Sequence, residues 1–348
     1  RYSGIHVSIL WKFLILFFYI VFIGYQRVYD VNQIFWNIGL ILAVFFCVTL
    51  HEFGHALMAK RFNYKTKDIT LLPIGGVARM ESLPEKPRQE FLVAIAGPLV
   101  NFIIAGLLLI IVSLNDMIPT EMSTYEPSVQ SFFFLLMAIN FFIGAFNLIP
   151  AFPMDGGRIL RALLAMKTSR VKATQIASSI GQFMAMLFLL LGLLYNPLLI
   201  IIALFIFLGA YGENQIVQHL ALLKGHSVEE AMIINMTTFN PVDSIDLVVN
   251  KIISGTENNF VVVKNHEIKG ILYHKTIIEN SNKNVLVKDI METDFKTVNN
   301  TDDLNEIYNI VFSEKKSFVP VLKDKKLVGV IDAVNLNEYI LLQAKLSY

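Results

Sequence analysis

The chain is poor in charge and in cysteine. Of its 348 residues only 16% are charged, whereas 55% are hydrophobic. This composition excludes an ordinary soluble protein and fits a membrane protein that carries a soluble part. The single cysteine, Cys47, excludes an intrachain disulfide. No basic stripe with interleaved aromatic residues occurs, so we expect no nucleic-acid partner.

The N-terminal and C-terminal parts of the chain differ in hydropathy and in net charge. Residues 225–348 contain no long apolar run and carry a net negative charge. Residues 1–224 contain all the long apolar runs and carry a net positive charge. We therefore predict a transmembrane domain over residues 1–224 and a soluble domain over residues 225–348.

The apolar runs predict six membrane-spanning helices of about 20 residues each. The predicted spans are roughly Ser8–Tyr25, Phe35–Met58, Phe91–Leu114, Phe132–Ile149, Ala173–Tyr195 and Leu198–Ala210. Basic residues cluster in stretches 60–90 and 150–172, whereas the loop 115–130 has none. The positive-inside rule then places both basic stretches, both chain ends and the soluble domain in the cytosol. The expected location is the cell membrane.

The second predicted span contains the motif H-E-x-x-H as His51-Glu52-Phe53-Gly54-His55. Ionisable side chains inside a span are costly, so they indicate a functional site. Residues four apart share one face of a helix, which allows His51 and His55 to bind one metal ion. Glu52 projects about 100° away from His51 and can hold a water molecule as general base. Two histidines that meet by chance would leave these three costly groups unexplained.

A third metal ligand has to come from the same depth of the membrane, and Asp155 meets this condition. It lies just beyond the cytosolic end of the fourth predicted span, after Pro150 and Pro153, which cannot extend a helix. We therefore expect Asp155 on an unwound, solvated segment that faces the second span. The alternative is a simple turn at residues 155–157 that caps the following helix.

Cys47 is a further candidate ligand, because it lies one helical turn before His51. A small buried packing residue would explain a cysteine at this position equally well, since free cysteine is commonly buried.

Four separate elements together resemble the site-2 protease family of intramembrane zinc metalloproteases, over about residues 5–215. They are H-E-F-G-H at 51–55, the hairpin-like segment 71–77, G-P-L-V-N at 97–101 and N-x-x-P-x-x-P-x-D-G-G at 147–157. The resemblance implies that His51, His55 and Asp155 bind zinc and that Glu52 is the catalytic base. It also suggests that Asn147 orients the substrate or the oxyanion, although a buried amide in a broken helix is equally consistent.

Asn101, within the third of these elements, is interpreted as a packing residue or a helix–helix hydrogen-bonding residue.

The soluble part contains an internal repeat. The strand-like segment Phe260–Val263 is echoed by Phe318–Val321, and Lys269–Leu272 is echoed by residues 327–331. Each repeat is predicted to form helix, strand, strand and helix. The repeats resemble a tandem pair of CBS domains, which often bind adenine nucleotides and regulate the attached protein.

Two interpretations of this pair remain open. The family's ribose-contacting pattern is Gly-x-x-Thr/Ser-x-x-Asp, but here Asp332 and Asn335 follow Gly329, and the first repeat departs at Tyr273 and Thr276. The pair either binds an adenine nucleotide or serves as a structural module, for example one that forms a homodimer.

The sequence thus predicts a polytopic α-helical membrane protein with six transmembrane helices and a cytosolic α/β tandem CBS domain. The predicted function is an intramembrane zinc endopeptidase that cleaves membrane-spanning protein substrates in or near the bilayer. One rival is a non-enzymatic transporter or ion-permeation protein with a regulatory CBS pair. Another is a membrane protease whose third ligand is a downstream glutamate. Glu213 lies at the wrong end of the sixth predicted span for that role, which favours Asp155.

Overall fold

The chain folds into two compact units, Arg1–Val217 and Gln218–Tyr348. The computed structural model describes residues 6–9, 30–64, 66–72, 75–80, 84, 86–115, 128–313 and 318–346. The division between the units falls inside one long helix, α7 (Leu198–Leu223), so this helix is continuous from the first unit into the second.

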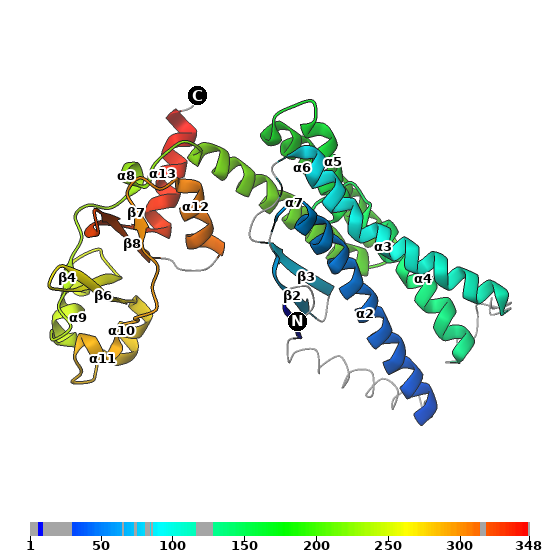
Figure 1. Cartoon of the computed structure of the whole chain (residues 1–348), viewed down its shortest axis with the longest axis horizontal. Coiled ribbons are helices and arrows are strands. Elements are labelled where there is room, and N and C mark those ends of the chain that lie inside the picture. Colours follow the sequence, from blue (N-terminus) through cyan, green and yellow to red (C-terminus); the bar gives the residue numbers. More distant parts are fainter. Residues whose placement is uncertain are drawn as a thin grey trace. The chain divides into compact units, whose positions relative to one another are not determined.

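Five helices in the described residues are long and apolar enough to cross a membrane (Figure 1). They are α2 (Val31–Arg61), α3 (Pro87–Leu114), α4 (Val129–Asn147), α6 (Arg170–Leu194) and α7. They match five of the six predicted spans, and α7 continues well beyond its predicted end at Ala210. The predicted first span, Ser8–Tyr25, lies outside the described residues except for Ser8 and Ile9, which belong to strand β1 (His6–Ile9).

Local side-chain chemistry explains where these helices begin. Asp30 accepts a hydrogen bond from the backbone N–H of Gln33 at 2.7 Å, and the Gln33 side chain accepts one from the Asp30 N–H. Ser128 and Ser131 form the same reciprocal pair at the start of α4. These boxes satisfy backbone N–H groups that have no partner within the helix. Helix α2 has 31 residues and is therefore about 46 Å long, more than the roughly 30 Å of a bilayer core.

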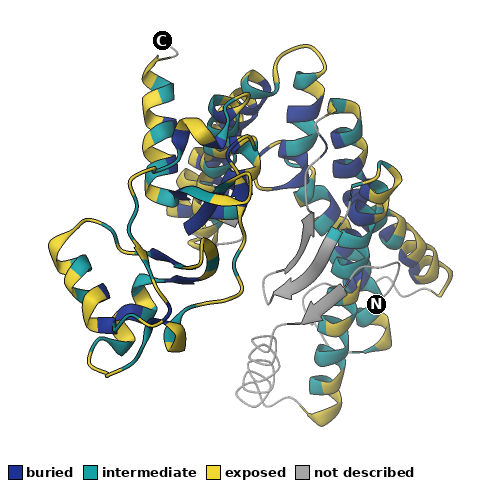
Figure 2. Cartoon of the chain, turned by 60° about the vertical axis from the view of Figure 1, so that its left-hand side comes forward, coloured by how far each residue is buried: buried dark blue, intermediate teal, exposed yellow. Residues whose placement is uncertain are grey.

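The outer faces of these helices are apolar. Large side chains such as Leu190, Leu194, Leu204 and Phe183 are exposed, while the buried residues form stripes where the helices meet (Figure 2). Contiguous apolar surface of this kind is unfavourable in water and suits contact with lipid.

A small sheet in the order β1–β2–β3 lies next to α2 (Figure 1). Strands β2 (Thr66–Leu72) and β3 (Gly75–Met80) pair antiparallel, and β1 pairs with β2 in parallel. The segment interpreted as a hairpin from sequence therefore forms one.

Helix α3 contacts α2, α4 and α5 (Asp155–Ala165), and its approach to α2 is close. A Cβ atom on Gly54 of α2 would lie within 3.0 Å of the Ala96 carbonyl oxygen and of the Val100 side chain. Only glycine leaves room for this approach, which brings the motif of α2 against the third span.

Asp155 is the first residue of α5, which corrects the expectation that it lies on an unwound segment. The non-helical stretch is instead residues 148–154, just before it. A Cβ on Gly156 or Gly157 would clash with the backbone of residues 148–152, so both glycines let this stretch fold closely over the start of α5. Phe152 is buried against α6 and α7 and fixes the stretch from the other side.

The second unit consists of two similar halves, as the repeat predicted. The first half contains α8 (Val228–Ala231), β4 (Thr238–Phe239), α9 (Ile245–Ser254), β5 (Phe260–Lys264), β6 (Glu267–Leu272) and α10 (His274–Asn280). The second contains α11 (Val287–Ile290), β7 (Val298–Asn299), α12 (Leu304–Tyr308), the π-helical turn η1 (Asn309–Ser313), β8 (Phe318–Lys323), β9 (Lys326–Asp332) and α13 (Ala333–Leu346). Each three-stranded sheet has one parallel and one antiparallel pairing, in the same order.

The two halves exchange backbone contacts. Ile233, at the start of the first half, bridges Val330 of β9, and Ile271 of β6 bridges Glu292 of the second half. A glycine lies at the crossing point in each half. In the first half, a Cβ on Gly270 would come within 3.0 Å of the Glu292 carbonyl oxygen.

We expect Gly270→Val to destabilise the second unit, because the added side chain separates β6 from the segment around Glu292. Lys269→Val is the matched control, since its exposed position in the same strand accepts valine without a clash. Limited proteolysis of the full chain should cut the Gly270→Val unit faster than the control. Equal rates would contradict the importance of this crossing.

Candidate metal centre

Three buried side chains from two helices converge on one point. His51 and His55 come from α2 and Asp155 from the first turn of α5. The two Nε2 atoms lie 3.1 Å apart, and the Asp155 Oδ2 atom lies 3.2 Å from the His51 Nε2 atom and 3.1 Å from the His55 Nε2 atom. The structure therefore brings together the three residues predicted as metal ligands.

The other ring nitrogen of each histidine is already used. His51 Nδ1 donates to the Asn101 side-chain oxygen, and His55 Nδ1 donates to the Val93 carbonyl oxygen at 2.7 Å. A neutral imidazole whose Nδ1 carries the proton has its lone pair on Nε2. The two Nε2 lone pairs thus face each other and a carboxylate oxygen. These three electron-rich atoms repel one another unless a cation lies between them.

Gly97 of α3 supplies the space for such a cation. A Cβ atom at this position would fall within 3.0 Å of both Nε2 atoms, which is the space where the ligands converge. The residue must be glycine for that space to stay open.

The spacing of the three donor atoms also fits a small tetrahedral metal ion. Donors about 2.0 to 2.1 Å from one tetrahedral ion lie about 3.3 Å from one another. The observed separations of 3.1 to 3.2 Å are close to this value. Two histidines and one carboxylate leave a fourth position for water or substrate, which is the pattern of a catalytic site.

The remaining candidates from the sequence lie around this group. Glu52 is half-buried on α2, next to His51 in the chain. Asn147 ends α4, and its Nδ2 atom donates to the Ile143 carbonyl oxygen at 3.1 Å, so its Oδ1 atom is not used in this bond. Cys47 packs against Leu108 and Leu136 and does not belong to the three-ligand group.

Sequence reasoning missed part of the support for His51. Asn101, interpreted from the sequence as a packing residue or a helix–helix hydrogen-bonding residue, makes bonds of the second kind. It accepts from the His51 Nδ1 atom of α2 and donates to the Asn140 Oδ1 atom of α4 at 2.9 Å. Asn140 in turn donates to the Leu136 carbonyl oxygen at 2.8 Å. This chain across α3 and α4 fixes the orientation of the His51 ring. Asn140 stands alone in an apolar run, and that isolation was the signal that could have identified it.

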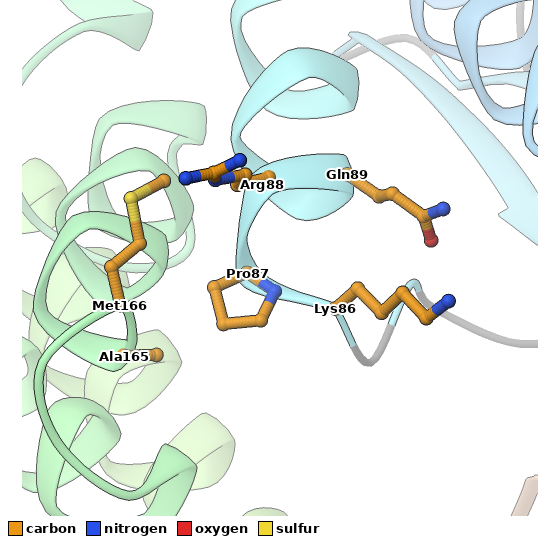
Figure 3. A pocket seen from close by; sticks show the side chains of 6 residues that line it. All are labelled: Lys86, Pro87, Arg88, Gln89, Ala165 and Met166. Atoms are coloured by element: carbon orange, nitrogen blue, oxygen red, sulfur yellow. The ribbon is translucent and has the colours of Figure 1, made fainter.

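A separate hollow of about 560 Å³ opens between the start of α3 and the end of α5. It is lined by Lys86, Pro87, Arg88, Gln89, Ala165 and Met166. Figure 3 shows Arg88 pointing toward Met166, with Lys86 and Gln89 pointing away from it. None of the three ligands lines this hollow, so it is not the metal centre.

Known proteins show the same combination of parts. The model of peptidase family M50 matches residues 39–120 and 113–192, and that of the CBS domain matches residues 287–342. A zinc metalloprotease of Methanocaldococcus jannaschii is 36% identical over 306 residues, which cover 88% of this chain and 85% of that protein. The stage IV sporulation protein FB of Bacillus subtilis is 32% identical over 137 residues, or 39% of this chain and 44% of that protein.

Among solved structures, a site-2 protease from Methanocaldococcus jannaschii is 40% identical, with 62% of this chain and 93% of that chain covered and a TM-score of 0.45. The identity to the first relative extends over most of both chains. The chain therefore belongs to peptidase family M50, the site-2 protease family of membrane-embedded metalloendopeptidases, and carries a CBS domain behind its peptidase region.

Proposed function

We propose that the chain is an intramembrane zinc endopeptidase that cleaves membrane-spanning protein substrates in or near the bilayer. The observation that carries this proposal is the convergence of His51, His55 and Asp155 around the space left by Gly97. The donor set suits zinc, which is also named in the relative from Methanocaldococcus jannaschii.

The residues of the chain divide the work of peptide hydrolysis. Zinc, when bound, polarises the scissile carbonyl and makes a water molecule more acidic. Glu52 accepts the proton of the attacking water and delivers it to the leaving amine nitrogen. Asn147, at the end of α4, offers an amide that orients the substrate backbone or its developing oxyanion.

The same geometry disfavours the rival function of ion permeation. A permeation path needs several polar binding sites along the pore, because each ion must move from one site to the next. Here the three donor atoms lie 3.1 to 3.2 Å from one another, so all of them can bind one ion, and both histidines are fixed by further hydrogen bonds. That arrangement favours retention of a metal ion over its transport.

The membrane orientation and the division of the chain are part of the proposal. The basic residues 60–90 and 150–172 support a cytosolic position for the end of α2 that carries the two histidines and for the start of α5 that carries Asp155. Both termini and the CBS unit then lie on the same side of the cell membrane. We propose a protease domain over residues 1–224 and a CBS-pair domain over residues 225–348.

We further propose that the CBS pair binds an adenine nucleotide and forms a homodimer, as the resemblance implies. At the position where the pair departs from the ribose-binding pattern, the side chain of Asp332 has a local role. Its Oδ1 atom accepts a hydrogen bond from the Asn335 N–H at 2.7 Å and so caps α13. Ribose contact then depends on other atoms of the pair.

Glu52→Gln tests the reaction. Glutamine keeps the size of the side chain but cannot take up a proton, so cleavage of a transmembrane substrate should fall by about 10²- to 10⁴-fold while zinc stays bound. Glu267→Gln, at the exposed first position of β6 in the second unit, is the matched control and should cleave normally. Turnover of purified Glu52→Gln close to that of the parent would remove the protease mechanism.

Gly97→Ala tests the metal site. The added methyl group takes the space between the two Nε2 atoms, so zinc content after purification should drop to a small fraction of the parent's. Gly106→Ala is the control, because the same substitution in the same helix meets no atom within 4 Å. Both variants gain the same helix propensity, so only the clash separates them. Full zinc occupancy in Gly97→Ala would place the metal elsewhere.

Nucleotide binding and dimerisation can be measured on the full chain in detergent. We expect calorimetry with AMP to give a saturable signal, and the mass of the purified particle to correspond to two chains. No heat at millimolar AMP would leave a structural CBS pair, and a single-chain mass would exclude the homodimer.

A further inference from the structure

A buried cluster of charges that the proposed reaction does not use joins three helices. Arg161 of α5 is fully buried. Its Nε and Nη2 atoms donate to Glu90 Oε1 of α3 at 2.8 and 2.5 Å, and its Nη1 atom donates to Glu213 Oε1 of α7. The guanidinium group therefore ties α5 to a helix on each side.

Two further contacts complete the cluster. The guanidinium carbon lies 5.0 Å from the ring centroid of Phe152, in the stretch that leads into Asp155. Arg170, at the start of α6, lies 3.7 Å from the second oxygen of Glu90. The Glu90 carboxylate thus faces two guanidinium groups, those of Arg161 and Arg170.

Burying such a charged cluster has an unfavourable desolvation free energy. Removing each ion from water costs several kcal/mol, and apolar residues of similar volume often give equal or greater stability. A guanidinium fork differs from apolar packing because its planar donors specify both distance and angle. The arrangement is therefore suited to hold α5 at one position and one rotation relative to α3 and α7.

The metal-binding carboxylate depends on that position. Asp155 is the first residue of the helix that Arg161 holds, and its two partners, His51 and His55, are packed against α3 through Gly97 and Val93. A shift of α5 relative to α3 would change the separation of the three donor atoms directly.

We propose, on the basis of the zinc site above, that Arg161 is a positioning residue for the metal-binding carboxylate and that Glu213 makes this position depend on α7. Helix α7 also approaches the same stretch closely at Gly209, where a Cβ would clash with Pro153. It is bonded to α6 at Ala210, whose carbonyl oxygen accepts from Ser178 Oγ at 2.7 Å. Its last turn ends at Leu223, a core residue of the second unit. A displacement of α7 that moves Glu213 would therefore act on α5, and so on Asp155, through Arg161.

The test compares zinc affinity, measured by competition with a chromophoric chelator on the folded full chain, in matched variants. Arg161→Met should weaken zinc binding by about tenfold or more, the usual effect of losing outer support for a metal ligand. Glu213→Leu leaves the bonds from Arg161 to Glu90 in place and removes only the bond to α7, so it should give a smaller but measurable loss. Gln215→Ala, two residues further along α7, should bind zinc like the parent.

Two controls separate positioning from stability. Leu108→Ala removes buried packing about 16 Å along α3 from Gly97 and should lower the melting temperature without changing zinc affinity. The triple variant Arg161→Met, Glu90→Leu, Glu213→Leu replaces all three charges by apolar groups and should recover melting temperature but not zinc affinity.

Parent-like zinc affinity in Arg161→Met, or recovery of affinity in the triple variant, would overturn the positioning role. Parent-like affinity in Glu213→Leu would overturn the dependence on α7. If the parent chain itself binds no zinc, the proposed function fails instead, so the two failures are distinguishable.

Discussion

Three electron-pair donors that face one another in a low-dielectric interior repel unless a cation lies between them, and the first unit is arranged around this constraint. His51 and His55 are each oriented by a hydrogen bond at Nδ1, and Asp155 is placed by its position at the start of α5. Asn101 and Val93 orient the rings, and the close crossing at Gly54 brings α3 near enough to do so. The packing of α2, α3 and α5 is thus the means by which a costly site is kept intact.

The lipid-facing surface and the polar interior follow different rules in the same helices. On the outer face, positions such as Leu190 and Leu204 are exposed, and the only requirement there is an apolar side chain. Inside, small residues decide where the backbones approach, and amides such as Asn140 and Asn101 bond across the gaps. Without a hydrophobic force between helices in lipid, such close contacts and hydrogen bonds supply the specificity of assembly. The described part of the first unit therefore depends on a few glycines and polar groups.

The parts predicted correctly from sequence are those encoded within single segments. Hydropathy located five spans, the spacing of His51 and His55 put both on one helix face, and repeated letters revealed the two halves of the second unit. Asp155 was found because its depth could be compared with that of His51, but its position at the start of α5 was not predicted. The partners of Asn101 and Arg161 depend on which helices meet, and no local pattern carries that information.

The exchange of backbone bridges in the second unit has a consequence for the order of folding during synthesis. Ile233 can form its bridge only after Val330, almost a hundred residues later, has been synthesised. Ile271 likewise needs Glu292 before its bridge can form. The first half can form its own hairpin as it leaves the ribosome, yet one edge stays unpaired until β9 has emerged. By then the spans before it are already made, so the membrane unit has time to assemble before the soluble unit closes. A chain interrupted before Val330 would carry finished spans and an open sheet edge, which is a form that quality-control proteases can recognise.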